Sequence, residues 1–369
     1  MPTWTGRAPG RLDLMGGVAD YSGALVLEVA TTVATTVVAE PADALVVGPA
    51  RLSRDEMVRL AGMDYPSLRA ELAGLPKWVL YPLGVALVLV RHAVIEPPAV
   101  ELRVTSEVPQ AVGVSSSAAL ELATARALTG EALDGVHLAA LCQEAENSVV
   151  GAPCGAMDQI AVAVGRPGRI VPILCRPGDP YPMEQIPAHL EVVGWPTGTE
   201  HDVTGLPYRR ARAAAFIGKR LIEHATGRQW DWISELPPAA LATLPEVVAG
   251  EAFLADLART GDPLTEVEPG VDYPVRAATA FGPAEHRRSD LLLAALRRAD
   301  TGPARRLFAA SHAGYQAMGL GHPAADRVVA DALGCEGVHG ARSSGGGSGG
   351  TVAVLCDRGA LDHVEGLIR

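Results

Sequence analysis

The stretch "VPQAVGVSSSAALELA" (Val108–Ala123) contains the change from strand to helix on which the interpretation of this chain depends. Residues 99–109 alternate between apolar and polar side chains, which predicts a strand. A short Gly-Ser loop follows, and residues 116–130 then show helical periodicity that ends at a glycine. Such a loop presents backbone N–H groups and three hydroxyls at the positive end of a helix, where phosphate groups bind favourably.

A helix cap is the simpler interpretation of the same loop, because serine is a preferred N-cap residue. One serine is enough for a cap, whereas here a Gly-Val pair is followed by three serines, so the sequence favours a phosphate site. The loop is not a Walker P-loop, since the G-x-x-x-x-G-K-[ST] pattern is absent and neither lysine lies near a glycine-rich loop.

A second motif, "EAENSVVGAPCGAMDQ" (Glu144–Gln159), places two acidic residues on either side of a tight turn. Glu146 lies on a predicted helix, and Asp158 opens the next one. Two such carboxylates can face one pocket, where one holds Mg²⁺ and the other acts on a substrate hydroxyl. Taken alone, the motif fits a second interpretation better: Glu146 on a solvated helix face, and Asp158 as a first-turn acid favoured by the helix dipole.

A third motif, "GARSSGGGSGGTVAVL" (Gly340–Leu355), has five glycines in six positions directly before a β-branched strand. A flexible Gly-Ser linker would have this composition. Both flanks are predicted to be structured, however, and glycines let a backbone approach a ligand or another segment closely. The position of the motif therefore favours an active-site loop over a linker.

Composition excludes several classes of partner. The 369 residues carry a net charge of −11, which argues against nucleic acid as a partner. Five cysteines without a C-x-x-C pair argue against a disulfide framework or a zinc site, so a reduced, cytoplasmic protein is expected. The N-terminus lacks a signal-peptide pattern. The longest apolar run, Trp78–Val90, is too short to cross a membrane and predicts a buried helix.

Predicted strands and helices interleave along the chain, which indicates a mixed α+β class, and the length favours two domains. Helix is predicted over residues 65–93 with a break near Leu75-Pro76. A further helix is predicted after Gly359, at the C-terminus. The Pro-rich segment Arg176–His189 is the candidate boundary, dividing the chain into domains 1–180 and 181–369.

Together with the N-terminal segment "RAPGRLDLMGGVADYSGALVLEVA" (Arg7–Ala30), these motifs resemble the GHMP small-molecule kinases in order and over almost the whole chain. The N-terminal segment, "GAPCGAMDQ" and residues 200–216 resemble the sugar 1-kinase branch around galactokinase. The resemblance implies an N-terminal domain like ribosomal protein S5 and a ferredoxin-like C-terminal domain, with the active site between them. It also implies ATP and Mg²⁺ as cofactors, a small-molecule sugar as substrate, and a monomer or homodimer.

The resemblance also implies roles for individual residues. Asp158 matches the proposed catalytic base, and Arg11 matches the arginine near the transferred phosphoryl group. Ser117 and Glu146 match the Mg²⁺ ligands. Gly345 to Gly347 match a loop that supports the site. The positions that match the loop cradling the ATP phosphates are Gly113, Val114, Ser115, Ser116 and Ser117. The positions expected to bind the sugar are Gly17, Val18, Asp20, Gly155 and Tyr208.

The N-terminal segment departs from the galactokinase pattern Gly-Glu-His-Thr-Asp-Tyr, because Gly17 and Val18 stand at the positions of Glu and His. In galactokinases that pair lies at the C6 hydroxymethyl end of the sugar, and a pocket that loses its polar partners no longer favours that hydroxyl. L-Arabinose has the galactose ring configuration without C6. The segments "MGGVADYSG" and "GLGHPAADR", and the serine in "GGGSGG", also resemble arabinokinases.

An ATP-dependent sugar 1-kinase with L-arabinose favoured is therefore the first hypothesis. A galactokinase acting on D-galactose or a C6-modified analogue is the second. L-Fucose remains an option for an apolar pocket, and D-galacturonate is less attractive because the N-terminal sugar-binding segment gains no basic residue at positions 16–21. A non-catalytic sugar and ATP sensor on the same fold is the hypothesis from another class; the intact "GVSSSAA" loop, Glu146, Asp158 and Arg11 oppose it.

Overall fold

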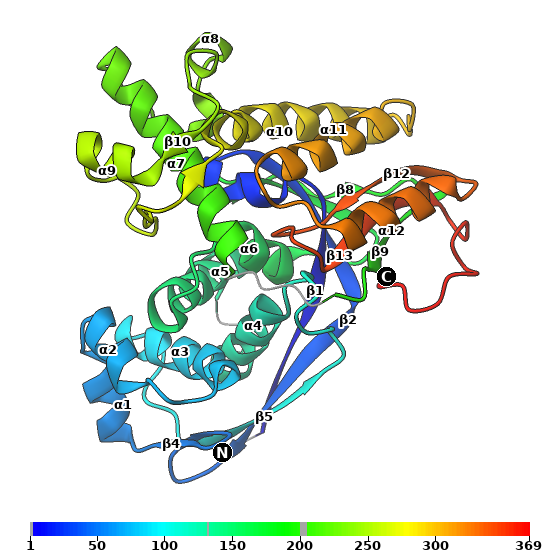
Figure 1. The fold of residues 1–369 in the computed structure, drawn as a ribbon. Coiled ribbons are helices and arrows are strands. Elements are labelled where there is room, and N and C mark those ends of the chain that lie inside the picture. The colour runs from blue at the N-terminus through cyan, green and yellow to red at the C-terminus, as the bar shows by residue number, and fades with distance from the viewer. Residues whose placement is uncertain (1–2, 131–132, 200–204) are drawn as a thin grey trace. The chain divides into compact units, whose positions relative to one another are not determined.

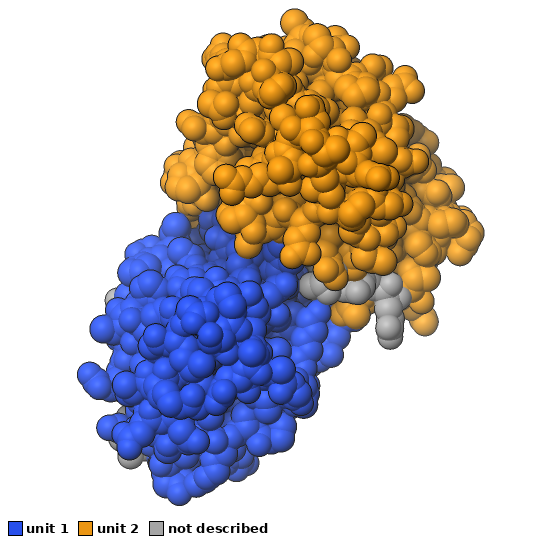
Figure 2. All heavy atoms as spheres, turned by 60° about the vertical axis from the view of Figure 1, so that its left-hand side comes forward, with its two compact units in different colours: residues 1–11, 30–110, 115–165 blue, residues 12–29, 111–114, 166–369 orange. Residues whose placement is uncertain are grey.

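The computed structural model describes residues 3–130, 133–199 and 205–369, which form two compact units. Unit 1 comprises residues 1–11, 30–110 and 115–165, and unit 2 comprises residues 12–29, 111–114 and 166–369 (Figure 2). Neither unit is continuous in sequence, because two long N-terminal strands contribute residues to both. The sequence-based division after residue 180 stays a prediction about domains, while the change between compact units falls at residues 165–166.

The strands of unit 1 surround a short parallel pair. Residues 35–41 of β2 pair antiparallel with β5, β5 pairs parallel with β3, and β3 pairs antiparallel with β4. β-Branched residues fill β2, as expected for a strand. The bounds are β1 (Trp4–Met15), β2 (Leu25–Pro41), β3 (Leu45–Val47), β4 (Ala50–Leu52) and β5 (Val100–Ser106).

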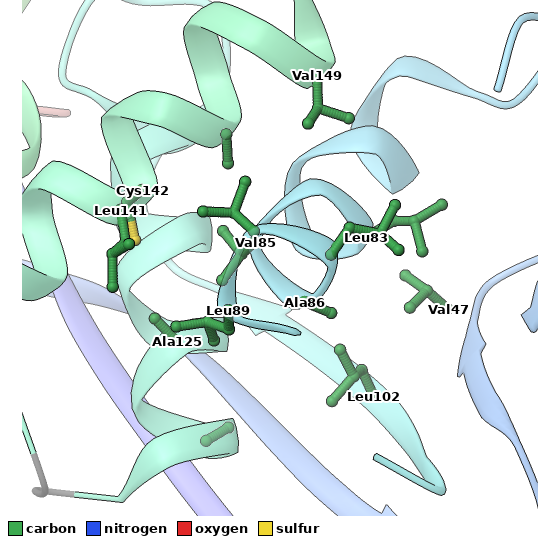
Figure 3. Close-up of a cluster of buried hydrophobic side chains, with 14 of the residues drawn as sticks. Val47, Leu83, Val85, Ala86, Leu89, Leu102, Ala125, Leu141, Cys142 and Val149 are labelled. Atoms are coloured by element: carbon green, nitrogen blue, oxygen red, sulfur yellow. The ribbon is translucent and has the colours of Figure 1, made fainter. Parts of the chain in front are cut away.

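Four helical segments of unit 1, α1, α4, α5 and η2, pack against the buried helix α3 (Figure 1). Its side chains Leu83, Val85 and Leu89 lie among residues of β3, β5, α4, α5 and η2 (Figure 3). This confirms the buried helix expected from the apolar run. The bounds are α1 (Arg54–Ala61), α2 (Tyr65–Glu71), α3 (Lys77–Arg91), α4 (Ser116–Thr129), α5 (Gly135–Glu144), the π-helix η2 (Ala145–Val150) and α6 (Met157–Val164).

Unit 2 contains two main sets of strands. Residues 25–29 of β2 pair antiparallel with β6, which also pairs with β7 and β8. A separate antiparallel sheet has the order β12-β13-β9. The bounds are β6 (Arg169–Leu174), β7 (Asp179–Pro180), β8 (Glu184–Gln185), β9 (Leu190–Pro196), β10 (Val248–Ala249), β11 (Asp272–Tyr273), β12 (Val338–Ser343) and β13 (Thr351–Asp357).

The helices of unit 2 bury two apolar clusters. One cluster joins the 3-10 helix η1 to α7, α10 and α11, and the other joins α12 to the β12-β13-β9 sheet. The bounds are η1 (Gly17–Ser22), α7 (Leu206–Thr226), the 3-10 helix η3 (Ile233–Glu235), α8 (Pro238–Leu241), α9 (Gly250–Leu257), α10 (Val275–Leu296), α11 (Ala304–Ala317) and α12 (Pro323–Gly334).

The helix predicted after Gly359 is wrong. Residues 358–369 form turns, in which Gly359 and Gly366 have φ angles of +83° and +74° that an α-helix does not use. Ile368 instead exchanges two backbone hydrogen bonds with Gly194 of β9. The predicted break near Leu75-Pro76 is confirmed by the gap between α2 and α3. In the described part of the chain, every helix is too short or too polar to cross a membrane.

Leu89→Ala tests the buried position of α3. Leu89 is fully buried, so its truncation should lower the free energy of unfolding by about 2–5 kcal/mol. The matched control is Leu291→Ala on α10, where the leucine is 46% exposed and the change should stay within about 0.5 kcal/mol. Urea denaturation measures both, and equal losses would contradict the assigned core.

Candidate active site

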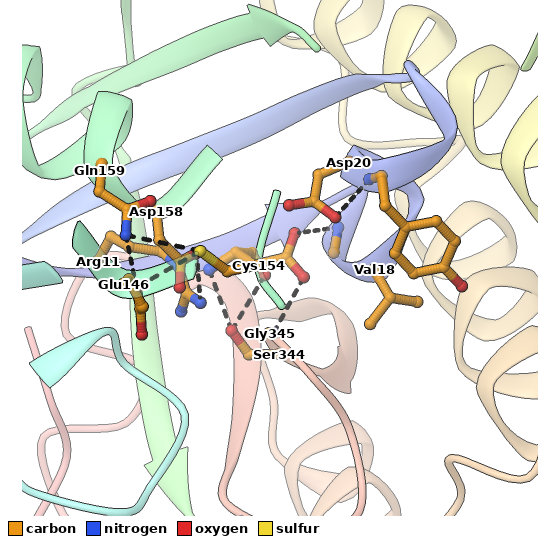
Figure 4. A network of polar contacts seen from close by, with 12 residues as sticks. Arg11, Val18, Asp20, Glu146, Cys154, Asp158, Gln159, Ser344 and Gly345 are labelled. Carbon is orange, nitrogen blue, oxygen red and sulfur yellow. Dashed lines mark hydrogen bonds and ion pairs between the residues drawn. The ribbon is translucent and has the colours of Figure 1, made fainter. Parts of the chain in front are cut away.

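Arg11 and Asp158 form a close ion pair in unit 1. Arg11 lies on β1 with only 2% of its side chain exposed, and Asp158 lies in the first turn of α6. The Nε and Nη2 atoms of Arg11 each lie 2.9 Å from Oδ1 of Asp158 (Figure 4). The buried arginine holds the Asp158 carboxylate in place. Asp158 remains 17% exposed, so its carboxylate still reaches solvent.

Glu146 lies close to this pair and is almost fully buried. The side-chain amide of Gln159 donates to its Oε2 at 2.5 Å, and the thiol of Cys154 donates to the same oxygen at 3.5 Å. Burial and the charge of Asp158 raise the pKa of Glu146 to about 7, against the effect of hydrogen bonds with Cys154, Ser117 and Gln159. Glu146 is therefore not on a solvated helix face; its interaction with Ser117 joins the two residues matched to Mg²⁺ ligands.

Two residues that sequence reasoning missed support this carboxylate. Gln159 also donates to Glu121 at 3.1 Å, so one amide joins two buried carboxyl groups. Burial and the neighbouring charge of Glu146 raise the pKa of Glu121 well above its ordinary value. The polar residue after Asp158 was visible in the sequence, but nothing in the periodicity of α4 marks Glu121 as facing it.

The turn before α6 is fixed by Asn147 of the π-helix. Its side-chain oxygen accepts from the backbone N–H of Cys154 at 2.8 Å, and its amide donates to the carbonyl of Cys154 at 3.3 Å. Gly155, one of the expected sugar-binding residues, follows in this half-buried turn. The π-helix was predicted as ordinary helix; such segments often occur at functional sites, and this one carries both Glu146 and Asn147.

Ser115 does not act as a side-chain cap for α4, although it occupies the N-cap position. It adopts a left-handed conformation with φ +57° and makes no capping hydrogen bond. The residue is 7% exposed, and its hydroxyl has no hydrogen-bond partner within the described residues. The structure therefore contradicts the simple cap at Ser115 and leaves a buried hydroxyl at the start of a 14-residue helix, where an anion is favoured. Of the loop's other residues, Gly113 has φ +77° and Val114 is buried.

In unit 2, a buried ion pair joins Asp13 of β1 to Arg342 of β12. Both side chains are 0% exposed, and Nη1 of Arg342 lies 2.8 Å from Oδ2 of Asp13. The Asp13 carboxylate also accepts from the backbone N–H groups of Gly17 at 2.9 Å and Gly345 at 3.1 Å. One carboxylate thus ties together two segments more than 300 residues apart: the start of η1 and the glycine-rich loop. Local sequence patterns do not mark this pair.

The glycine-rich loop is a buried turn between β12 and β13, so the linker interpretation is wrong. Ser344 is 1% exposed, and its hydroxyl accepts from the backbone N–H of Asp13 at 3.0 Å. Gly345 has φ +60° and Gly347 has φ +75°. A Cβ at Gly347 would lie 2.7 Å from the ring of Tyr315, so glycine lets the backbone pass closely there.

Gly17 and Val18 lie in η1 against Tyr315 of α11. The tyrosine hydroxyl accepts from the backbone N–H of Val18 at 3.1 Å and donates to the carbonyl of Gly345 at 2.5 Å. Gly17, Val18 and Tyr315 are all buried. The expected sugar-binding segment is therefore held by its backbone.

Asp20 and Tyr208 lie around Arg212, another residue that the sequence motifs do not include. Tyr208 is 6% exposed and packs edge-to-face on Tyr21, with ring centroids 6.1 Å apart. The Arg212 guanidinium lies over the Tyr21 ring at 5.2 Å and pairs with Asp262 at 2.9 Å. Burial opposes its charge, but Tyr208, Asp262 and Asp20 outweigh burial and raise the pKa of Arg212.

The expected residues thus gather in two groups. Arg11, Ser117, Glu146 and Asp158 come together in unit 1. Gly17, Val18, Asp20 and Tyr208 belong to unit 2, where Val18 and Tyr208 share one buried cluster and Asp20 and Tyr208 both act on Arg212. Residues 200–204, which open the stretch matched to the sugar-contacting tyrosine, lie outside the described residues. Across the described ranges, no three His, Cys, Asp or Glu side chains form a cluster that could enclose a metal.

Arg342→Met tests the buried pair. The substitution leaves the Asp13 carboxylate buried without its cation, which should lower the free energy of unfolding by about 3–5 kcal/mol. The double variant Asp13→Leu/Arg342→Met should recover part of that loss. Arg51→Met breaks an exposed pair with Asp43 and serves as the control, with little measurable change expected. Similar thermal unfolding of Arg342→Met and Arg51→Met would contradict the assignment.

Three family profiles match the chain. The galactokinase galactose-binding signature covers residues 2–41, the GHMP kinase N-terminal domain covers residues 81–166, and the GHMP kinase C-terminal domain covers residues 292–365. The first includes Arg11, Gly17, Val18 and Asp20, and the second includes the serine loop and Asp158. The matches follow the chain order expected from the sequence motifs.

Individual relatives agree with these profiles. An Arabidopsis thaliana L-arabinokinase is 29% identical over 95% of this chain, which spans 42% of that protein's length. A galactokinase from Chloroflexus aurantiacus is 31% identical over the whole chain, which covers 86% of that protein. The structure of Lactococcus lactis galactokinase complexed with galactose has a TM-score of 0.77 at 21% identity, over 98% of this chain and 87% of that one, and shows the shared fold. The chain belongs to the GHMP kinase family, among its sugar kinases of the galactokinase and L-arabinokinase type.

Proposed function

We propose that this protein transfers the γ-phosphoryl group of ATP to the anomeric C1 hydroxyl of a galactose-configured sugar, with L-arabinose favoured, giving the sugar 1-phosphate and ADP. The observation that carries the proposal is the Arg11–Asp158 pair, which keeps a carboxylate fixed and partly exposed in unit 1. The family membership supports the reaction class, and the roles of individual residues are part of the proposal.

Asp158 is the group that accepts the hydroxyl proton. As the C1 oxygen forms its bond to the γ-phosphorus, the bond from that phosphorus to the ADP oxygen breaks, and the proton passes to the Asp158 carboxylate. Arg11 donates to Oδ1 of Asp158, so it fixes the direction of the base. Its guanidinium also places positive charge beside the migrating phosphoryl group.

The serine loop fits the phosphates of the nucleotide. Ser115 offers a buried hydroxyl that has no hydrogen-bond partner among the described residues. Ser116 and Ser117 begin α4, where backbone N–H groups point out of the helix. Mg²⁺ fits Ser117 and Glu146, because hydroxyl and carboxylate oxygens are its ligands and it needs few from the protein. When bound, the ion neutralises charge on the nucleotide phosphates.

The sugar specificity follows from Gly17 and Val18. Neither offers a side-chain hydrogen bond to a hydroxymethyl group, and a pentose without C6 loses nothing there. Asp20 and Tyr208 supply polar groups for the ring hydroxyls. D-Galactose is the second candidate, supported by galactokinase relatives of which the chain covers 84–86%.

Substrate selectivity is the first test. A coupled ADP-release assay should give the highest kcat/KM with L-arabinose and a lower value with D-galactose. L-Fucose should also give a lower value, because its ring has the mirror-image configuration of D-galactose. D-Galacturonate should give the lowest value, because residues 16–21 supply no cation for a C6 carboxylate. A D-galactose value equal to or above that of L-arabinose would favour galactokinase, and no turnover of any of these sugars would overturn the substrate argument.

Asp158→Asn tests the catalytic role. It removes the proton acceptor but keeps the shape, so kcat should fall by roughly 10²–10⁴-fold while sugar and ATP binding, measured by calorimetry, change little. Asp55→Asn is the matched control, since Asp55 is an exposed first-turn acid of α1 in the same unit. Unchanged turnover in Asp158→Asn would exclude Asp158 as the base. A wild-type protein that binds both ligands without turnover would be a sensor.

A further inference from the structure

Tyr315 fills the space that a side chain at position 17 would need. A Cβ built on Gly17 would lie 1.8 Å from the Tyr315 hydroxyl and 2.6 Å from Oδ2 of Asp13, and Gly17 has φ +49°. An acidic side chain, as the galactokinase pattern has at this position, therefore has no room in this structure. Tyr315, almost 300 positions away in the sequence, therefore explains why residue 17 is a glycine.

The Tyr315 hydroxyl has its hydrogen bonds directed to backbone groups. It accepts from the Val18 N–H at 3.1 Å and donates to the Gly345 carbonyl at 2.5 Å. A phenol has one proton to donate, so this hydroxyl has none left for a sugar. The space that an acidic side chain at position 17 would occupy is thus filled by a hydroxyl that, among the described residues, bonds only to the backbone of Val18 and Gly345.

The Tyr315 ring is held on several sides. The Arg342 guanidinium lies 5.0 Å from the ring centroid, and Phe281 packs edge-to-face at 5.5 Å. The backbone N–H of Leu320 donates a hydrogen bond to the Tyr315 carbonyl at 2.8 Å. Because the side chain is 0% exposed and closely packed, it cannot move aside to admit a larger residue at position 17.

We propose that Tyr315 is a specificity-determining positioning residue: by excluding a side chain at position 17 and fixing the Val18 backbone, it selects sugars that lack a C6 hydroxyl. The inference rests on the proposed function, because it assigns the segment around Gly17 and Val18 to sugar binding. Tyr315 lies outside every sequence motif described above. Its position in α11 explains why residue 17 of η1 is glycine and not the glutamate of the galactokinase pattern.

Tyr315→Phe is the direct test. The Val18 N–H loses its partner and becomes available to a sugar hydroxyl or water, so the ratio of kcat/KM for L-arabinose over D-galactose should fall roughly tenfold. The change should come mainly through KM, with kcat for L-arabinose altered less. Tyr273→Phe is the matched control, since Tyr273 is also buried in unit 2 and its hydroxyl accepts a backbone N–H, that of Glu268. The control should leave the ratio unchanged.

A second measurement does not depend on turnover. Gly17→Ala should lower the melting temperature strongly in the wild-type background and less in Tyr315→Phe, because the closest clash is with the hydroxyl that Phe lacks. If Gly17→Ala lowers the melting temperature equally in both backgrounds, Tyr315 does not exclude a side chain at position 17. Wild-type turnover with an unchanged sugar ratio in Tyr315→Phe would overturn the specificity role alone. Absence of wild-type sugar turnover would overturn it together with the proposed function.

Discussion

The ion pair between Asp13 and Arg342 is the constraint on which the expected sugar-binding region depends. Burying two charges is costly, and the cost is offset only when the geometry is good and the remaining polar atoms find partners. The Asp13 carboxylate meets this condition, with Arg342 and two backbone N–H groups around it. The Arg342 Nε and Nη2 atoms have no hydrogen-bond acceptor among the described residues, and the guanidinium instead lies over the Tyr315 ring.

That arrangement joins three segments that are far apart in sequence. The carboxylate holds the N–H groups of Gly17 and Gly345, and the Tyr315 hydroxyl joins the Val18 N–H to the Gly345 carbonyl. The loop around Gly17 thus has its shape set by hydrogen bonds to its backbone. These hydrogen bonds involve backbone groups of Gly17 and Val18 and not their side chains, which is consistent with the proposed role of the two residues in sugar selectivity.

Unit 1 brings several acidic side chains close together. Asp158, Glu146 and Glu121 are three acidic groups near one another, and burial makes their mutual repulsion stronger. Arg11 pairs with Asp158, and the Gln159 amide donates to the two glutamates. A bound divalent cation would relieve the remaining negative charge, in agreement with the role proposed for Ser117 and Glu146.

Local sequence patterns were sufficient for several elements and for the family. The strand–loop–helix change around Ser115 and the buried helix α3 follow from residues close together in the chain, and the motif order identified the GHMP kinases. Asp13, Arg342 and Tyr315 could not be found this way, because their importance comes from contacts across 300 residues. The C-terminal helix was mispredicted because its pattern carries no sign of the pairing between Ile368 and Gly194. The catalytic and binding roles stay predictions.

The central claim is phosphorylation at C1, and the product reports on it directly. L-Arabinose labelled with ¹³C at C1, incubated with the protein, ATP and Mg²⁺, should give a product whose C1 resonance is split by coupling to ³¹P. A phosphorylated product whose labelled C1 resonance shows no coupling to ³¹P, or ATP hydrolysis without a phosphorylated sugar, would contradict the account.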